Sequence, residues 1–191
     1  MSQNFLLNAS FHLFLNKIDQ ELADKTQSEG CQFCGGKLHQ DDYPRSPLGI
    51  PAKLRTYYDN HLGFCCVDCR KRTTPMSVRF FGRRWYPAPL FILISLLTLG
   101  INKRRLAQIK KYFALAVSET TWRRWRKWWR DAFTQTQFWQ KEKGRLPPIP
   151  AIIQGPYPRV LLDVLQGKLE EKMGLLLQFL SPLTGGVLRA V

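Results

Sequence analysis

Two Cys-x-x-Cys pairs in this chain have the residue type and spacing of a metal-binding site. Cys31 and Cys34 form the first pair, and Cys66 and Cys69 form the second after a long intervening segment. Each pair can present two thiolates to one metal ion, and four thiolates are the ligand set of a closed tetrahedral zinc site. The two glycines after the first pair allow the positive φ angles of a tight knuckle. We therefore predict one structural Zn²⁺ held by these four cysteines.

Other ligand sets and a disulfide framework are the alternatives for these cysteines. The chain has five cysteines, an odd number, and its first residues lack the basic segment of a secretory signal, so metal binding in a reducing compartment is favoured. Cys65 stands beside Cys66 and could replace it, although the second pair would then become Cys-x-x-x-Cys. His39 and His61 are the remaining candidates, and as non-ligands we expect both in solvated loops. Four thiolates leave no open position for water or substrate, so we expect a structural rather than a catalytic metal.

The charge of the chain indicates a polyanionic partner. Its 191 residues carry a formal net charge of +15 with a pI of about 10.0, and 45% of them are hydrophobic, as in folded proteins. The apolar run 90–99 is much shorter than the roughly 20 residues that span a bilayer, so it predicts a buried helix and no membrane partner. We expect a cytoplasmic, nucleoid-associated protein whose partner is nucleic acid, with duplex DNA as the first choice.

The sequence predicts an α+β fold in four consecutive segments, which must position the cysteines and the cations. Residues 1–30 are expected to form an amphipathic helix capped by Ser10 and a linker at 26–30. A zinc ribbon with an insertion should follow over 31–86, and a helix-turn-helix domain over 87–142. A Pro-rich linker and a short helical tail complete the chain over 143–191, and packing of this tail onto its own chain is the simplest use of its apolar residues.

Within the predicted ribbon, a hairpin is expected through 57–61 and a strand over 77–81. Cations and aromatic residues alternate along this edge, and such mixing suits phosphate contacts with occasional base stacking. The alternative is that the aromatic residues are core and the arginines only solubilise the surface. The candidate nucleic-acid contacts of this edge are Arg70, Lys71, Arg72, Arg79, Arg83 and Arg84.

Three helices with short connections are predicted for the helix-turn-helix domain, over 88–99, from Asn102 and from Ser118. In the third helix, one face is aromatic and should pack on the core. The aromatic residues are Trp122, Trp125, Trp129 and Phe133. The opposite face is cationic, as expected of a recognition helix in a major groove.

The candidate contacts of this domain fall into two groups. The expected base contacts are Thr120, Thr121, Arg123 and Arg124. The expected phosphate contacts are Arg126, Lys127 and Arg130 of the third helix, with Lys103, Arg104, Arg105, Lys110 and Lys111 of the preceding helix. We expect the zinc site to hold the basic edge 70–84 beside the helix 118–130.

Over residues 31–131, the chain resembles the N-terminal DNA-binding part of zinc-ribbon transposases of bacterial insertion sequences. The resemblance rests on the four-cysteine ribbon, the basic run after Cys69 and the Arg-Trp-Arg third helix. It implies that Cys31, Cys34, Cys66 and Cys69 take the zinc-ligand positions, and that the protein recognises element ends or the promoter of a mobile element.

The chain departs from these transposases in its acidic residues. A transposase nuclease holds two divalent ions with three acidic residues, whereas Asp163 is the one acid here on an apolar segment. We therefore expect a DNA-binding protein that is accessory or regulatory to transposition and is not itself an enzyme. A homo-oligomer or a separate transposase could bind through the N-terminal helix or the tail. The alternatives are an RNA-binding component of a ribonucleoprotein and a fragment of a metal-dependent transposase.

Overall fold

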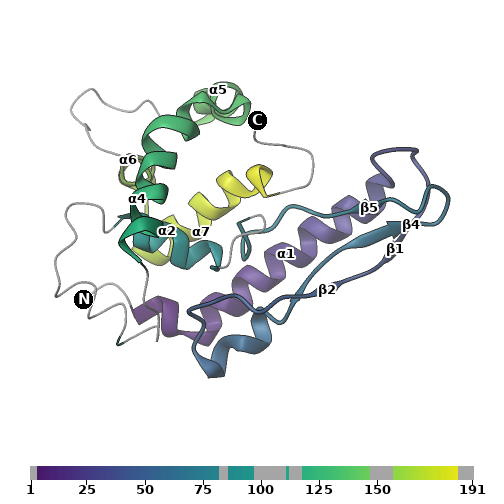
Figure 1. The fold of residues 1–191 in the computed structure, drawn as a ribbon, viewed down its shortest axis with the longest axis horizontal. Helices are drawn as coiled ribbons and strands as arrows, with labels where there is room; N and C mark the ends of the chain where they lie inside the picture. The colour runs from purple at the N-terminus through teal and green to yellow at the C-terminus, as the bar shows by residue number, and fades with distance from the viewer. Residues whose placement is uncertain (1–3, 82–85, 97–110, 112–117, 147–156, 185–191) are drawn as a thin grey trace.

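A long helix, α1 (Ala9–Glu29), organises the fold, as Figure 1 shows. The structure is a computed structural model that describes residues 4–81, 86–96, 111, 118–146 and 157–184. A small antiparallel β module lies along the C-terminal half of α1, and the other helices gather around its N-terminal half (Figure 1). The predicted α+β class is confirmed. In the part of the chain described, no helix is both long and apolar enough to cross a bilayer.

The ends of α1 differ from the prediction. Asn8 is the N-cap, because its side-chain oxygen accepts a hydrogen bond from the backbone N–H of Ser10 at 3.0 Å. Residues 26–29, predicted as a linker, are helical, and the helix ends at Gly30 with φ 78°. Cys31 therefore follows the helix with one residue between them, so α1 directly positions the first cysteine pair.

The β module consists of short antiparallel strands. Its three-stranded sheet has the order β1-β4-β5, and β2 pairs with β3 in a second sheet. The strands are β1 (Leu38–Gln40), β2 (Tyr43–Pro44), β3 (Asn60–His61), β4 (Phe64–Cys66) and β5 (Arg72–Thr73). A 3₁₀ helix, Ala52–Tyr57, leads into β3 where a hairpin was predicted. This helix packs against α1 and buries Leu54 completely. The insertion between the two cysteine pairs, which contains this helix, is therefore a folded part of the domain.

The helical core joins segments that are far apart in the sequence. The helices around the N-terminal half of α1 are α2 (Ala88–Leu96), α4 (Glu119–Lys127), α5 (Gln137–Glu142), α6 (Arg159–Val164) and α7 (Leu169–Leu180). A π-helical turn, Trp128–Ala132, extends α4, and short 3₁₀ turns are Asn4–Leu7, Phe133–Gln135, Lys143–Arg145 and Ser181–Leu183. The ring of Phe91 on α2 lies 5.0 Å from Trp125 and 5.8 Å from Trp129. These aromatic contacts attach α4 to α2.

The helical tail packs onto its own chain, which was the simplest of its predicted roles. Leu161 of α6 and Met173, Leu176 and Leu177 of α7 belong to the same buried cluster as Phe11 of α1. The two ends of the described chain are therefore joined in one core.

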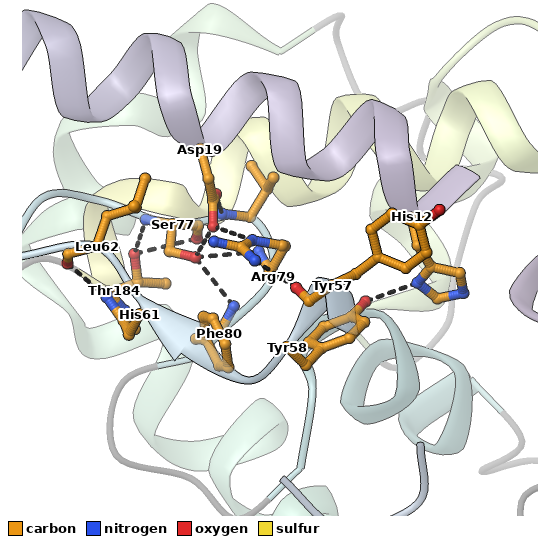
Figure 2. Close-up of polar contacts among 11 residues, drawn as sticks. His12, Asp19, Tyr57, Tyr58, His61, Leu62, Ser77, Arg79, Phe80 and Thr184 are labelled. Atoms are coloured by element: carbon orange, nitrogen blue, oxygen red, sulfur yellow. Dashed lines mark hydrogen bonds and ion pairs between the residues drawn. The ribbon is translucent and has the colours of Figure 1, made fainter. Parts of the chain in front are cut away.

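A buried polar cluster around Asp19 joins four segments of the chain (Figure 2). The Asp19 carboxylate accepts hydrogen bonds from Ser77 Oγ at 2.6 Å, Val78 N at 2.6 Å and Arg79 Nε at 2.7 Å. Arg79 also donates to the carbonyl of Tyr57, and the backbone N–H of Ser77 donates to Thr184 Oγ1 at 2.7 Å. Because the backbone of 77–79 bonds to side chains, this segment is not the strand that was predicted; only Phe80 forms an isolated bridge, to Pro87.

A second buried polar contact holds the insertion against α1. His12 is 3% exposed, and its Nε2 lies 2.8 Å from the Leu6 carbonyl while its Nδ1 lies 2.8 Å from the Tyr58 hydroxyl. Since a carbonyl only accepts, Nε2–H donates to Leu6 and Nδ1 accepts from Tyr58 in neutral His12. Burial lowers the pKa of His12 and outweighs the opposing hydrogen bond to Leu6. The neutral imidazole is therefore the form that this contact stabilises.

Candidate metal centre and basic surfaces

The first Cys-x-x-Cys pair forms a tight knuckle directly after α1. The backbone N–H of Gly35 donates to the Cys31 carbonyl at 2.7 Å, and the N–H of Cys31 donates to the Gly36 carbonyl at 2.9 Å. Gly35 has φ 74°, a conformation that glycine adopts without a Cβ clash. A Cβ at Gly36 would collide with the Asp68 carboxylate and would lie 3.1 Å from Cys66 Sγ. The two glycines therefore have separate roles, one in the turn and one in the approach of the second knuckle.

The second pair repeats this geometry. The N–H of Arg70 donates to the Cys66 carbonyl at 3.1 Å, and the N–H of Cys66 donates to the Lys71 carbonyl at 3.0 Å. Arg70 takes the place of Gly35, with φ 57°. A left-handed conformation costs a non-glycine residue roughly 1 to 2 kcal/mol, so the knuckle must hold Arg70 in place.

The two knuckles bring four sulfur atoms together. Sγ of Cys31 lies 3.6 Å from Sγ of Cys69, and Sγ of Cys34 lies 3.5 Å from Sγ of Cys66. All four sulfurs lie within 4.8 Å of one another. A tetrahedral zinc with bonds of about 2.3 Å separates its sulfurs by about 3.8 Å, whereas a disulfide needs about 2.05 Å. The predicted cysteines are thus clustered as free thiols that could hold a metal ion.

The surroundings of Cys31 favour a thiolate, the form that binds metals. Burial opposes ionisation of this thiol, but the backbone N–H groups of Phe33 and Cys34 stabilise the anion, as do hydrogen bonds with the Cys69 and Cys34 thiols. Together they lower the pKa of Cys31 to about 6. The Phe33 N–H lies 3.4 Å from Cys31 Sγ. Hydrogen bonds with the neighbouring thiols act the other way on Cys34 and Cys69 and raise the pKa of both, so Cys31 is the member of the cluster whose surroundings favour the thiolate.

The alternative ligands lie outside the cluster. Cys65 Sγ lies 3.6 Å from the Arg70 carbonyl, since alternate residues of β4 point to opposite faces of the sheet. His39 is exposed. His61, expected in a solvated loop, is buried between the rings of Tyr43 at 5.1 Å and Phe80 at 4.8 Å. Cys66 and not Cys65 is the member of the four-sulfur group.

The predicted cations of the ribbon edge have different surroundings. Arg70 and Lys71 are exposed beside the second knuckle. Arg72 pairs with Asp41 at 2.5 Å. Arg79 is 3% exposed and pairs with Asp19, so its prediction as a nucleic-acid contact is corrected: a phosphate could reach this guanidinium only if the buried ion pair opened. Arg83 and Arg84 lie outside the described residues.

On α4, the aromatic and cationic faces are separate. Ser118 Oγ caps the helix by accepting from the Thr121 N–H at 3.1 Å, as predicted. Trp125, Trp129 and Phe133 are buried, and Trp128 is half-buried, while the side chain of Trp122 is not described. The exposed cations of this segment are Arg123, Arg124, Arg126, Lys127 and Arg130. Arg130 pairs with Asp131 at 2.6 Å.

The remaining predicted contacts are only partly described. Thr120 is exposed and Thr121 is half-buried, while Lys111 is exposed. Lys103, Arg104, Arg105 and Lys110 of the expected second helix lie outside the described residues, as do Gly100 and Asn102. The helix-turn-helix thus stays a prediction.

The cysteine cluster and α4 lie toward opposite ends of α1 (Figure 1). Leu15 packs in the helical core that includes Trp125 of α4, whereas Cys31 belongs to a separate buried cluster with Leu38 and Phe64. The α-helical rise from Leu15 to Glu29 is about 21 Å. The expectation that the basic edge 70–84 lies beside the helix 118–130 holds at the far end of this edge, where Phe81 packs in the helical core with its ring 5.6 Å from that of Trp128. It is wrong for Arg70 and Lys71, which lie beside the second knuckle, because α1 separates this knuckle from α4.

Comparison with protein-family models, curated proteins and solved structures found no match for this chain.

Proposed function

We propose that this chain is a DNA-binding protein that uses the cationic face of α4 to contact duplex DNA and one structural Zn²⁺ to fold its β module. The separation of faces on α4 carries the proposal. Trp125 and Trp129 anchor the helix in the core, so the cations on its other face are presented by a rigid support. Five cations between residues 123 and 130, with no acid among them, exceed the need for solubility.

Zinc is the metal that the cluster suits best. Its four donor atoms are all sulfur, and thiolates select Zn²⁺ over hard ions such as Mg²⁺. The sulfur separations of 3.5 and 3.6 Å are near those of a tetrahedral site. Four protein ligands would leave no position for substrate, so the metal would stabilise the fold and take no part in a reaction.

The protein would serve a mobile element in an accessory or regulatory role, without a nuclease centre of its own. Asp163, the acid on an apolar segment, is exposed and pairs with Arg159 at 2.8 Å, as a surface residue does. Incubation of the zinc-loaded chain with supercoiled DNA and Mg²⁺ or Mn²⁺ should leave the DNA intact. Cleavage that co-purifies with the chain would contradict this part of the proposal.

The salt dependence of DNA affinity tests the role of α4. If about six phosphates are neutralised, affinity for a duplex should fall roughly a thousandfold between about 50 and 200 mM salt. Replacing Arg126 and Lys127 by Ala should reduce the slope by about two ions. The matched control replaces Lys53 and Arg55, an exposed lysine and arginine on the 3₁₀ helix of the insertion. It removes the same charge and should leave the slope nearly unchanged.

Two results would contradict the proposal. Equal losses from the α4 pair and the control pair would show that net charge alone drives binding. Tighter binding of structured RNA than of duplex DNA of equal length, at one salt concentration, would favour the RNA-binding alternative.

A further inference from the structure

The tip of the β module exposes apolar side chains beside cations. Phe33 lies inside the first cysteine pair and is 53% exposed, and Val67 lies inside the second and is 41% exposed. The Lys71 ammonium lies 4.8 Å from the centre of the Phe33 ring, and the Val67 N–H donates to the Lys37 carbonyl at 3.0 Å. These contacts connect the two knuckles. We call Phe33, Lys37, Val67, Arg70 and Lys71 the knuckle tip.

Cations outnumber acids at the knuckle tip. Lys37, Arg70 and Lys71 are exposed, and Asp68 is the exposed acid beside them. A metal-bound tetrathiolate carries two negative charges, so part of this positive charge would offset the metal site. Charge balance does not require an aromatic ring, and it leaves the exposure of Phe33 unexplained.

We propose that the knuckle tip binds an unpaired DNA base. The ring of Phe33 stacks on the base, and the cations contact the phosphates beside it. An exposed ring with adjacent cations is the combination that binds single strands with little sequence preference. The inference rests on the proposed DNA-binding function and adds a second kind of DNA to it.

The base must be unpaired because stacking requires an open face. In a duplex, neighbouring base pairs cover both faces of each base, so Phe33 cannot stack inside it. The cationic face of α4 makes no such demand, since phosphates are exposed in a duplex. The distance along α1 between the knuckle tip and α4 allows the two surfaces to hold different stretches of DNA.

Fluorescence anisotropy on the full, zinc-loaded chain tests the proposal. The probes are a labelled thymidine strand of about 12 nucleotides, within the site sizes of single-strand binders, and a duplex of the same length. Phe33→Ala should weaken single-strand binding roughly tenfold and leave duplex binding unchanged. The matched control is Phe14→Ala, since Phe14 on α1 is 48% exposed and lies outside the knuckle tip. It should change neither affinity.

The outcomes separate the two proposals. If the wild-type chain binds duplex DNA but Phe33→Ala binds the single strand as well as wild type, base stacking at the knuckle tip is wrong and the duplex function stands. If the chain binds neither DNA, both proposals fail. Tighter binding of a uridine RNA strand than of the thymidine strand would overturn the choice of DNA.

A second measurement does not depend on the variant folding. A strand substituted with bromodeoxyuridine, irradiated on the wild-type chain, should crosslink to the peptide that contains Phe33. Crosslinks confined to peptides outside the knuckle tip would overturn the proposal. Metal content of Phe33→Ala equal to that of wild type would show that a loss of affinity does not come from a damaged metal site.

Discussion

Removing the metal from the cysteine cluster should unfold the sheet and knuckles around it and leave the helical core intact. The large apolar side chains buried there are Leu38 and Phe64, and their burial contributes about 3 to 6 kcal/mol. Zn²⁺ binding by a structural site contributes about 10 to 16 kcal/mol at neutral pH. Since β1, β4 and β5 are only two or three residues long, their hydrogen bonds cannot replace the metal.

The structure defines which segments should lose amide protection when the metal is removed. Segments 31–40 and 64–73 carry the knuckles and the three-stranded sheet. Segment 52–61 is held to α1 by the buried His12–Tyr58 contact, and segment 169–180 belongs to the helical core. Chelation should lower the free energy of local opening in the first two segments by about 3 kcal/mol or more, so their amide protection should fall at least about a hundredfold. The other two segments should keep their protection.

Hydrogen exchange measured by mass spectrometry, before and after chelation and again after Zn²⁺ is restored, provides the test. Metal analysis should find about one zinc per chain. Cys66→Ser should lose this metal, whereas Cys65→Ser, the same change at the neighbouring residue, should keep it, because Cys65 lies outside the four-sulfur group. Unchanged protection of segments 31–40 and 64–73 in metal-free protein would refute the reasoning, and so would equal metal loss in the two variants.

Two further predictions concern the buried polar groups. Asp19→Asn should lower the free energy of unfolding in urea by about 3 to 5 kcal/mol, because it leaves the buried Arg79 guanidinium without its carboxylate. The control Asp163→Asn, in an exposed ion pair, should lower it by less than about 1 kcal/mol. Similar losses in the two variants would contradict the assigned role of Asp19. Because burial lowers the pKa of His12, the folded chain binds fewer protons than the unfolded chain. The stability from neutral His12 is therefore full above pH about 6.5 and is lost as pH falls, by up to about 1.4 kcal/mol per pH unit. Thermal unfolding across this range should show a smaller pH dependence in His12→Gln than in wild type, and an identical one would count against the neutral, buried imidazole.

The clustering of Cys31, Cys34, Cys66 and Cys69 could be predicted because its signal is local. Two residues between paired cysteines set the size of a knuckle, whatever lies elsewhere in the chain. The same holds for α4, where aromatic spacing predicted the buried face of Trp125 and Trp129. Phe33 has an equally local signal, its position between two paired cysteines. That position does not distinguish an exposed ring from a core residue, and the structure does so through the exposure of Phe33 and the Lys71 ammonium over its ring.

Arg79 shows where local signals fail. It lies in a run of cations and aromatic residues that predicts a basic surface, yet it is buried. The reason is Asp19, a residue of α1 that is distant in sequence and whose carboxylate binds Arg79, Ser77 and Val78 together. The same contacts replace the strand predicted over 77–81, because Asp19 and not a neighbouring strand accepts the Val78 N–H.

The sequence by itself therefore determined which groups could bind a metal or a polyanion. These groups are four cysteine thiols in two knuckles, a helix with one aromatic and one cationic face, and an excess of positive charge. Tertiary structure decided which of these groups act together. The helical extension of α1 to Glu29 connects the cysteine cluster to the helical core and keeps α4 away from it. Burial against Asp19 removes one arginine from the surface, and the approach of the knuckles places Lys71 over Phe33. Residue spacing encodes local geometry, whereas a contact between distant segments depends on how the whole core packs.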